Sequence, residues 1–170
     1  MTPEQQLDQL QSAHEIRELA YRYAYAHDAC DPELLLSLWE ETETPLQPPA
    51  IDIHRVRAVH IPALKTRGPS ILFVGNHIIE FEGSDEARGI VYCLVQLEVD
   101  GAFVDQSVVY GDRYLRREGT WRFVHRRHVL WYGIERDRHP FDQPAADWPA
   151  RAVGRGTAVT ELRSELGLGR

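Results

Sequence analysis

The chain has 170 residues, a length that suits one domain able to bury a core without disulfides or bound metal. Its hydrophobic content of 43% and charged content of 26% are those of an ordinary globular protein. A formal net charge of −7 at pH 7 argues against nucleic acid as a partner of the whole surface.

Two cysteines, Cys30 and Cys93, have neither CxxC spacing nor paired histidines nearby, so no disulfide framework or zinc site is expected. The sequence also contains no metal-ligand spacing on one helix, no P-loop and no dinucleotide-binding glycine motif. No apolar run approaches about 18 residues, and the first residues do not follow the pattern of a secretion signal. We therefore expect a cytoplasmic protein without a metal, a cofactor or a membrane segment.

The first third of the chain predicts helices. Residues 3–28 carry apolar side chains, among them Tyr23, at spacings of three and four, behind a Thr2 cap. Asp31 is expected to cap a second helix, Pro32–Glu40. Residues 41–51 contain three prolines and predict a loop or a poor edge strand.

A third helix is expected from Asp52 to about Lys65, with Pro62 interrupting it near its end. Four strand-like segments follow, rich in β-branched and aromatic residues, at Ser70–Phe81, Ala87–Val99, Phe103–Glu118 and Thr120–Ile134. Three helices followed by a meander predict an α+β fold, with the helices on one face of a bent sheet around a pocket.

The polar tail of residues 135–170 is expected to be an extension of a 1–134 domain. Residues Thr157–Leu166 can form a short helix in it. The sequence leaves open whether this tail packs across the pocket mouth, reaches a partner subunit or is loosely ordered.

The hairpin Val108–Gly133 has faces of mixed polarity. Simple alternation places Arg126, His128 and Leu130 on one face of its second arm and Trp121 and Phe123 on the other. The first face is expected to line the pocket together with Tyr110 and Asp112 of the first arm, and the second to pack on another layer, such as a second subunit.

Asp28 lies in the last turn of the first helix, where the helix dipole disfavours a negative charge. Two hypotheses follow from this position. The helix end is frayed and solvated, or the carboxylate is aimed into a pocket.

Three segments together resemble the SnoaL-like branch of the NTF2-like superfamily: EIRELAYRYAYAHDACDPELLLSLW, GNHIIEFEGSDEARG and YGDRYLRREGTWRFVHRRHVLW. The resemblance covers roughly residues 12–132. It implies a cone-shaped α+β barrel, often a homodimer packed sheet to sheet. It also implies relatives such as polyketide cyclases, scytalone dehydratase, ketosteroid isomerase and lindane dehydrochlorinase, which mostly need no cofactor and abstract a proton from carbon.

The family's catalytic pair is only half present. Asp28 matches the helix-1 aspartate that pairs with a catalytic histidine in the dehydratase and dehydrochlorinase branch. The histidine should lie four residues before Asn76, where this chain has Leu72. His77 is of opposite parity to Leu72, so alternation predicts that it points to the other face of the sheet, as a surface or dimer-face histidine.

The last strand offers a substitute for the missing histidine. Arg126 matches the family's cationic position, and His128 follows it on the same face. We therefore expect His128 to act as general base or acid, held by Asp28 or Asp112. Arg126 would bind an oxyanion and Tyr110 would donate a hydrogen bond to it. Further pocket-lining residues are expected at Tyr23, Asp112, Leu72, Asn76 and Leu130.

The alternative for the same residues is a buried ion pair of Arg126 with Asp112 or Asp28 that only shapes the pocket. Histidines on the helices, including His60, are expected to be structural or solvated.

The function expected from these features is that of a cofactor-independent lyase or isomerase, such as a dehydratase or cyclase, acting on a small hydrophobic, cyclic or aromatic substrate. Two alternatives remain: a ligand-binding or assembly module without catalysis, favoured by Leu72, and a partner resembling the small subunit of an aromatic-ring dioxygenase. A homodimer or higher oligomer is expected to form through the sheet, with no nucleic-acid or membrane partner.

Overall fold

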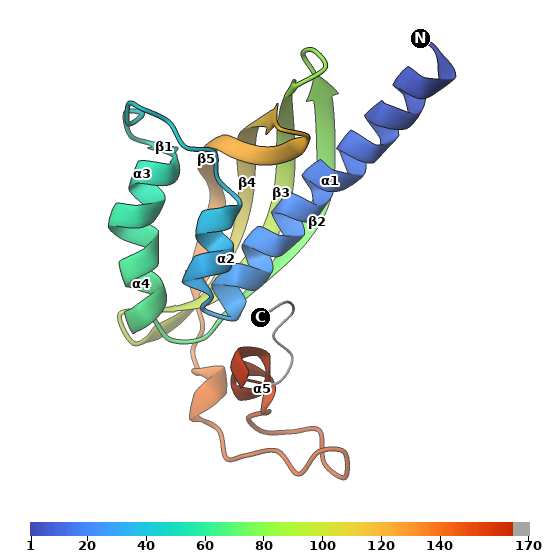
Figure 1. Cartoon of the computed structure of the whole chain (residues 1–170). Coiled ribbons are helices and arrows are strands. Elements are labelled where there is room, and N and C mark those ends of the chain that lie inside the picture. Colours follow the sequence, from blue (N-terminus) through green and yellow to red (C-terminus); the bar gives the residue numbers. More distant parts are fainter. Residues whose placement is uncertain (165–170) are drawn as a thin grey trace.

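Five antiparallel strands form one bent sheet in this computed structural model, which describes residues 1–164, with side chains to residue 161. The strand order is β1-β5-β4-β3-β2, and the helices cover one face of the sheet, which we call the concave face (Figure 1). The strands are β1 (Ala50–Ile51), β2 (Ser70–Phe81), β3 (Glu86–Val99), β4 (Ala102–Arg117) and β5 (Thr120–Glu135). The predicted α+β fold and the antiparallel meander are confirmed.

Helix α1 (Pro3–Asp28) begins at the predicted cap, where Gln5 and Thr2 form a reciprocal capping box. Its first turns project beyond the sheet (Figure 1), and Ser12 is its first buried residue. The second half crosses the concave face and buries Ile16 and Tyr23. α1 thus delivers its last turn, including Asp28, to one end of that face.

The short α2 (Pro32–Ser37) follows the Asp31 cap, as predicted. The expected third helix is a helical run in three parts: α3 (Ile53–Arg55), a π-helical turn (Val56–His60) and α4 (Ile61–Thr66). The irregular turn lies just before Pro62, which lacks an N–H and sits in the first turn of α4.

Two β-bulges change which residues face the core. Gly75 and Asn76 of β2 together oppose one residue of β3, and Val124 is the extra residue of β5 opposite β4. Each extra residue reverses the alternation of the strand beyond it.

These bulges correct two expectations. His77 lies on the same face as Leu72, the concave one, where its ring bonds to Tyr114. Phe123 lies on the same face of the sheet as Arg126, and not on the opposite face as expected. Trp121 and Phe123 both pack under the helices. Strict alternation failed because it assumed uninterrupted strands.

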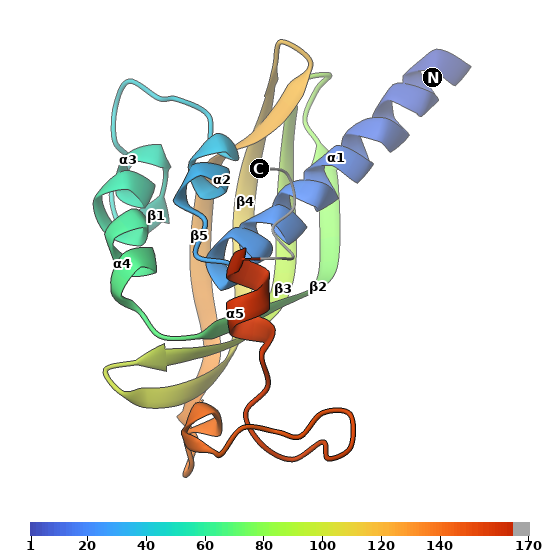
Figure 2. The same cartoon turned by 60° about the horizontal axis from the view of Figure 1, so that its bottom comes forward.

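The tail follows β5, and its first residues pack beside the turn of the β3–β4 hairpin. His139 and Phe141 pack on Phe103, with ring centroids 5.2 and 5.7 Å from it. Helix α5 (Ala158–Ser164) occupies part of the predicted Thr157–Leu166 helix, whose last two residues lie outside the described chain. The tail runs below the end of the sheet at which α1 finishes (Figures 1 and 2).

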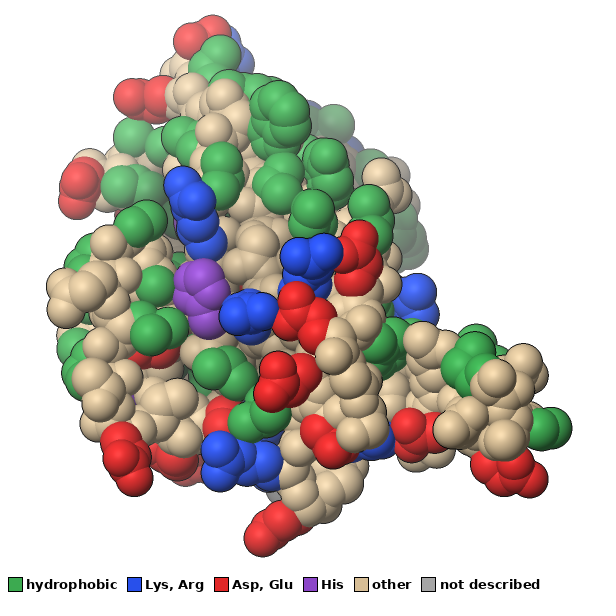
Figure 3. Space-filling model, turned by 90° about the horizontal axis from the view of Figure 1, so that it is seen from above, with side chains coloured by type: hydrophobic (Ala, Val, Ile, Leu, Met, Phe, Trp, Pro, Cys, Tyr) green, Lys and Arg blue, Asp and Glu red, His purple; other side chains and the backbone are tan. Residues whose placement is uncertain are grey.

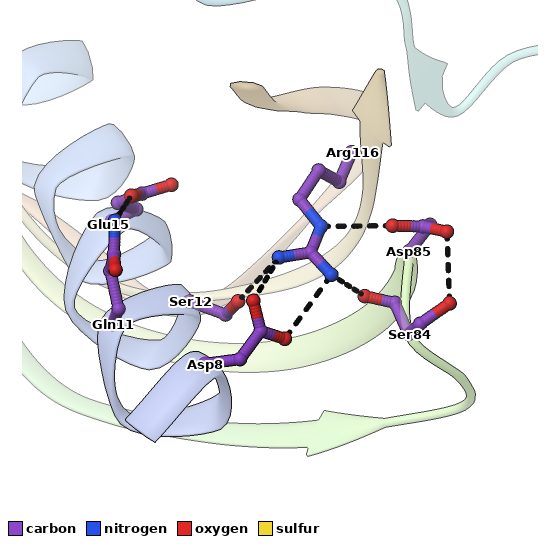
Figure 4. Close-up of polar contacts among 7 residues, drawn as sticks. All are labelled: Asp8, Gln11, Ser12, Glu15, Ser84, Asp85 and Arg116. Carbon is purple, nitrogen blue, oxygen red and sulfur yellow. Dashed lines mark hydrogen bonds and ion pairs between the residues drawn. The ribbon is translucent and has the colours of Figure 1, made fainter. Parts of the chain in front are cut away.

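Arg116 fastens the projecting half of α1 to the sheet (Figure 4). Its guanidinium donates to Asp8 at 2.7 Å and to Ser12 at 3.3 Å on the helix. On the β2–β3 turn it donates to Asp85 at 2.9 Å and to the carbonyl of Ser84 at 2.7 Å. The side chain is only 18% exposed, so these bonds are partly shielded from water.

Arg116→Ala is expected to lower the free energy of unfolding by about 1–3 kcal/mol, because it removes several charge-assisted hydrogen bonds at once. Urea denaturation measures this loss, and amide exchange in residues 4–12 is expected to accelerate. Arg88→Ala is the control, since Arg88 is 59% exposed in its pair with Glu80 and should contribute less than about 1 kcal/mol. Equal losses in the two variants would contradict this role of Arg116.

Candidate functional site

A buried ion pair occupies the middle of the concave face. Arg126 Nε and Nη2 donate to the two carboxylate oxygens of Asp112 at 2.8 and 2.6 Å. The side chains are 1% and 0% exposed. The rings of Tyr23, Tyr110 and Phe123 surround the guanidinium, with centroids 4.1–4.5 Å from its central carbon. This arrangement corresponds to the alternative weighed from the sequence, an ion pair that shapes the pocket.

The hydrogen-bond chain continues from this pair toward β2. Tyr114 donates its hydroxyl to Asp112 at 2.8 Å and lies 3.1 Å from His77 Nε2. Because the hydroxyl proton goes to Asp112, His77 must donate through Nε2–H. Burial lowers the pKa of His77 to about 4, so its ring is neutral, and its buried Nδ1 has no partner among the described residues. A Cβ at Gly89 would lie 3.0 Å from His77 Nε2 and from the Tyr114 hydroxyl, so any other residue would force these side chains to shift.

Asp28 lies at the end of α1, beside the first residues of β2. Its two carboxylate oxygens accept from the Leu72 backbone N–H at 3.1 Å each, and Ser70 Oγ lies 3.2 Å from one of them. Burial raises the pKa of Asp28 to about 6, against the opposing effects of these hydrogen bonds and of Arg67. The carboxylate is thus oriented by the backbone of the residue that stands where the family's histidine is expected.

A cluster of polar residues that was not predicted from the sequence surrounds the Asp28 end of α1. Arg67 Nη2 donates to the carbonyl of His27 at 2.8 Å and to Ser70 Oγ at 2.9 Å. The His27 ring is 4.5 Å from the Tyr23 ring and 5.8 Å from the His60 ring. The only signal in the sequence was the position of His27 next to Asp28, because its contacts with Arg67 and His60 come from distant parts of the chain.

His128 lines a hollow of about 380 Å³ between β5, the β1 edge and the helical run. Its ring lies 5.4 Å from the Tyr110 ring. Burial lowers the pKa of His128, and the positive charge of Arg126 lowers it further. His60 and Leu130 line the same hollow. The other lining residues are Pro49, Ile51, Arg55 and Gln106.

The expected bond between His128 and a carboxylate is absent from the described residues. Asp112 bonds to Arg126 and Tyr114, and Asp28 bonds to Leu72 and Ser70. The structure thus divides the predicted site residues into three groups: the ion-pair cluster with Tyr23 and Tyr110, Asp28 with Leu72, and His128 with Leu130. The ring contact between Tyr110 and His128 connects the first group with the third. Asn76 joins none of them, because it is exposed in the β2 bulge.

A second hollow, of about 620 Å³, lies on the outer, convex face of the sheet. Its lining includes Ile78, Ile90, Gly111, His125 and Arg127. Its lining includes neither Asp28 nor His128, but it does include Asp112 of the ion pair.

A family model described as a SnoaL-like domain matches residues 8–127, most of the chain. The chain belongs to the SnoaL-like family. The resemblance stated from the sequence is thereby confirmed. A search of curated proteins found no match.

Solved structures share the fold of this SnoaL-like protein. The LinA-type3 hexachlorocyclohexane dehydrochlorinase of Novosphingobium barchaimii is 22% identical, with a TM-score of 0.66 over 79% of this chain and 96% of that one. A proposed scytalone dehydratase of Novosphingobium aromaticivorans is 19% identical, with a TM-score of 0.66 over 78% and 92%. An NTF2-like protein with a cystatin-like fold, also from N. aromaticivorans, is 27% identical, with a TM-score of 0.57 over 74% and 86%.

Within residues 1–164, no three histidine, cysteine or acidic side chains are grouped so that they could hold a metal ion. In the same part of the chain, no helix has the length and apolar character needed to cross a membrane.

Arg126→Ala is expected to cost about 3–5 kcal/mol of unfolding free energy, because it leaves the Asp112 carboxylate buried without its cation. The neighbouring Arg127→Ala is the matched control. Arg127 is exposed, and its removal should change stability by no more than about 0.5 kcal/mol. Urea denaturation of both variants tests the difference, and similar values for the two would refute the importance of the pair.

Asp28→Asn is expected to stabilise the fold at pH 7.5 and to have no such effect at pH 4. The pKa of this carboxyl rises from 3.8 to about 6 on folding, so ionisation is disfavoured in the native state. The neutral Asp28 carboxyl contributes its full amount to the free energy of unfolding below pH 3.8. This contribution, at most about 3 kcal/mol, is lost as the pH rises through 6. Thermal unfolding across this pH range measures the effect. A variant less stable than wild type at pH 7.5 would contradict it.

Proposed function

We propose that the protein is a cofactor-independent lyase or isomerase that transfers a proton at carbon in a small hydrophobic, cyclic or aromatic substrate, with Asp28 as the proton acceptor. The observation that carries the proposal is the oriented Asp28 carboxyl with a pKa of about 6. A carboxyl of this pKa is largely ionised at neutral pH and still basic enough to take a proton and return it.

The surroundings of Asp28 support this role. The Leu72 N–H and Ser70 hold the carboxylate in one orientation. Burial outweighs the effect of these hydrogen bonds and of the Arg67 charge on the pKa of Asp28, so the carboxylate remains basic. Leu72 itself cannot take a proton, which leaves Asp28 to act directly rather than through a histidine. In this proposal His128 contacts the substrate at the hollow, and Arg126 contributes a fixed positive potential, since its hydrogen-bonding groups are engaged by Asp112.

The alternative is a binding protein without catalysis, which the leucine at position 72 favours. Both functions predict that aromatic and cyclic ligands raise the melting temperature. Only catalysis predicts that a carbon-bound proton of the ligand exchanges with solvent or that the ligand is converted.

The test is proton exchange in deuterated water, followed by NMR, with a panel of cyclic ketones and of hydroxylated or halogenated ring compounds. Asp28→Asn is expected to slow exchange of an active compound by about 10²–10⁴-fold, as loss of a general base does. Asp31→Asn is the matched control. It makes the same change three residues away, and Asn caps a helix as well as Asp does. Unchanged exchange in Asp28→Asn would exclude Asp28 as the base, and ligands that bind without exchange or conversion would favour the alternative.

We also propose that two copies associate through the convex face of the sheet. Large apolar side chains are exposed there: Phe73 is 68% exposed, Leu94 54%, Val129 46% and Tyr92 40%. They form a continuous area, because Phe73 is paired with Leu94, and Val109 connects Tyr92 with Val129. From above, hydrophobic side chains cover part of the surface beside a group of charged ones (Figure 3). An apolar face of this kind can pair with its own copy about a two-fold axis.

Leu94→Glu is expected to convert the dimer into a monomer, because it would bury a charge in that interface. Light scattering coupled to size-exclusion chromatography measures the mass. Leu10→Glu, at a residue that is 70% exposed on α1, should remain dimeric. A monomeric wild type at micromolar concentration would refute the proposal.

A further inference from the structure

The hollow of about 620 Å³ on the convex face takes no part in the chemistry proposed for Asp28. It extends over two adjacent rows of paired residues that cross four strands. One row is Ile78, Ile90, Gly111 and Arg127, and the next is Glu80, Arg88, Arg113 and His125. A hollow of this size can hold a small organic molecule.

Gly111 leaves a position in the middle of β4 without a side chain. Its backbone does not have the positive φ that favours glycine, and a Cβ built there would meet no heavy atom beyond its chain neighbours within 4 Å. Neither backbone strain nor crowding within the chain therefore explains this glycine, although glycine inside a strand weakens the strand. A glycine of this kind often marks a place where a ligand comes close to the backbone.

Apolar side chains border Gly111 on its β2 side. Ile90 is its direct neighbour on β3 and is 45% exposed. Ile78 is paired with Ile90 on β2 and is 55% exposed. A planar ring that lies against the bare backbone of Gly111 would remove apolar area of both isoleucines from water. This side of the hollow thus favours a flat apolar group.

The opposite side of Gly111 is cationic. Arg127 is its direct neighbour on β5, and no hydrogen bond or ion pair joins the Arg127 guanidinium to another described residue. His125 lies one pair further along β5. Burial is the largest of the effects that together lower the pKa of His125, so its ring is mostly neutral at pH 7. The positive charge on this side is therefore that of Arg127.

The other charged groups at the hollow already have partners of opposite charge. These ion pairs are Arg88 with Glu80, Arg113 with Glu82 and, on the concave side, Asp112 with Arg126. Arg127 is thus the arginine of the hollow that is free to bind an anion. One carboxylate matches a single guanidinium in charge and in the spacing of its two oxygens.

We propose that this hollow is a second ligand site, which binds a planar aromatic molecule that carries one carboxylate. The ring lies over Gly111 and against Ile78 and Ile90, and the carboxylate accepts hydrogen bonds from Arg127. The site includes none of the four residues of the apolar area proposed to join two copies. It also does not depend on Asp28 acting as a base.

The experiment is an NMR titration that follows the Ile90 amide with 2-naphthoate and with its neutral isostere 2-naphthamide. Wild type is expected to bind the carboxylate about tenfold more tightly, because it forms charge-assisted hydrogen bonds. Arg127→Gln should reduce this preference to about twofold or less. Arg117→Gln is the matched control and should keep the preference. Arg117 is 64% exposed on the same hairpin, and its replacement makes the same change in net charge.

Gly111→Val tests the position of the ring. The valine side chain would fill the open space over the backbone, so both probes should bind about tenfold or more weakly than to wild type. Valine suits a strand, so the melting temperature should not fall. Asp28→Asn should bind both probes as wild type does, which separates this site from the proposed function.

Three results would overturn the inference: no shift of the Ile90 amide with 2-naphthoate, equal affinity for the two probes, or unchanged affinities in both Arg127→Gln and Gly111→Val. A dimer that dissociates in Gly111→Val, together with no binding of 2-naphthoate to wild type, would also refute the ligand site. That result would assign the hollow to the contact between two copies.

Discussion

The guanidinium of Arg126 is enclosed on its faces by Tyr23, Tyr110 and Phe123 and bonded along its edge to Asp112. A charge buried this completely must keep its partner, because an unpaired ion in the same place would cost several kcal/mol. The constraint fixes the position of α1 on the sheet, since Tyr23 is the helix residue in contact with the cation. It also affects the packing beyond the pair, where Tyr114 bonds to Asp112 and His77 bonds to Tyr114. Gly89 leaves room for both side chains.

The concave face is polar in two different ways. At its centre the polar side chains bond to one another, and the chemistry of Arg126 and Asp112 is occupied by their mutual contact. At the end of α1 the polar groups are incompletely satisfied: Asp28 is held but poorly solvated, and His27 and Arg67 keep buried nitrogens without partners. Such incomplete satisfaction reduces stability and is typical of sites that bind or transform a ligand. The ion pair holds α1 in place, and in the proposed function the end of α1 carries the chemistry.

The helices and strands were predictable because their signals are local. Capping residues, proline positions and β-branched runs placed α1, α2 and the four long strands within a few residues of their observed bounds. The side-chain faces were less predictable, since one extra residue at Gly75–Asn76 or at Val124 reverses them. A glycine inside a strand does signal a possible bulge, as Gly75 shows, but Val124 carries no such signal. The polar cluster of His27, Arg67 and His60 could not be predicted from residue spacing in the sequence, because tertiary packing alone brings these residues together.

The fold makes Asp28 an unusually weak acid, and the proposed function depends on this because a weak acid has a more basic carboxylate. The most direct measurement is an NMR titration of the side-chain carboxyl carbons, with the Asp28 resonance assigned by its loss in Asp28→Asn. The account predicts an apparent pKa of about 6 for Asp28. A value at or below the ordinary 3.8 would contradict it, because an acid of that strength is fully ionised in the folded protein and is a weak proton acceptor.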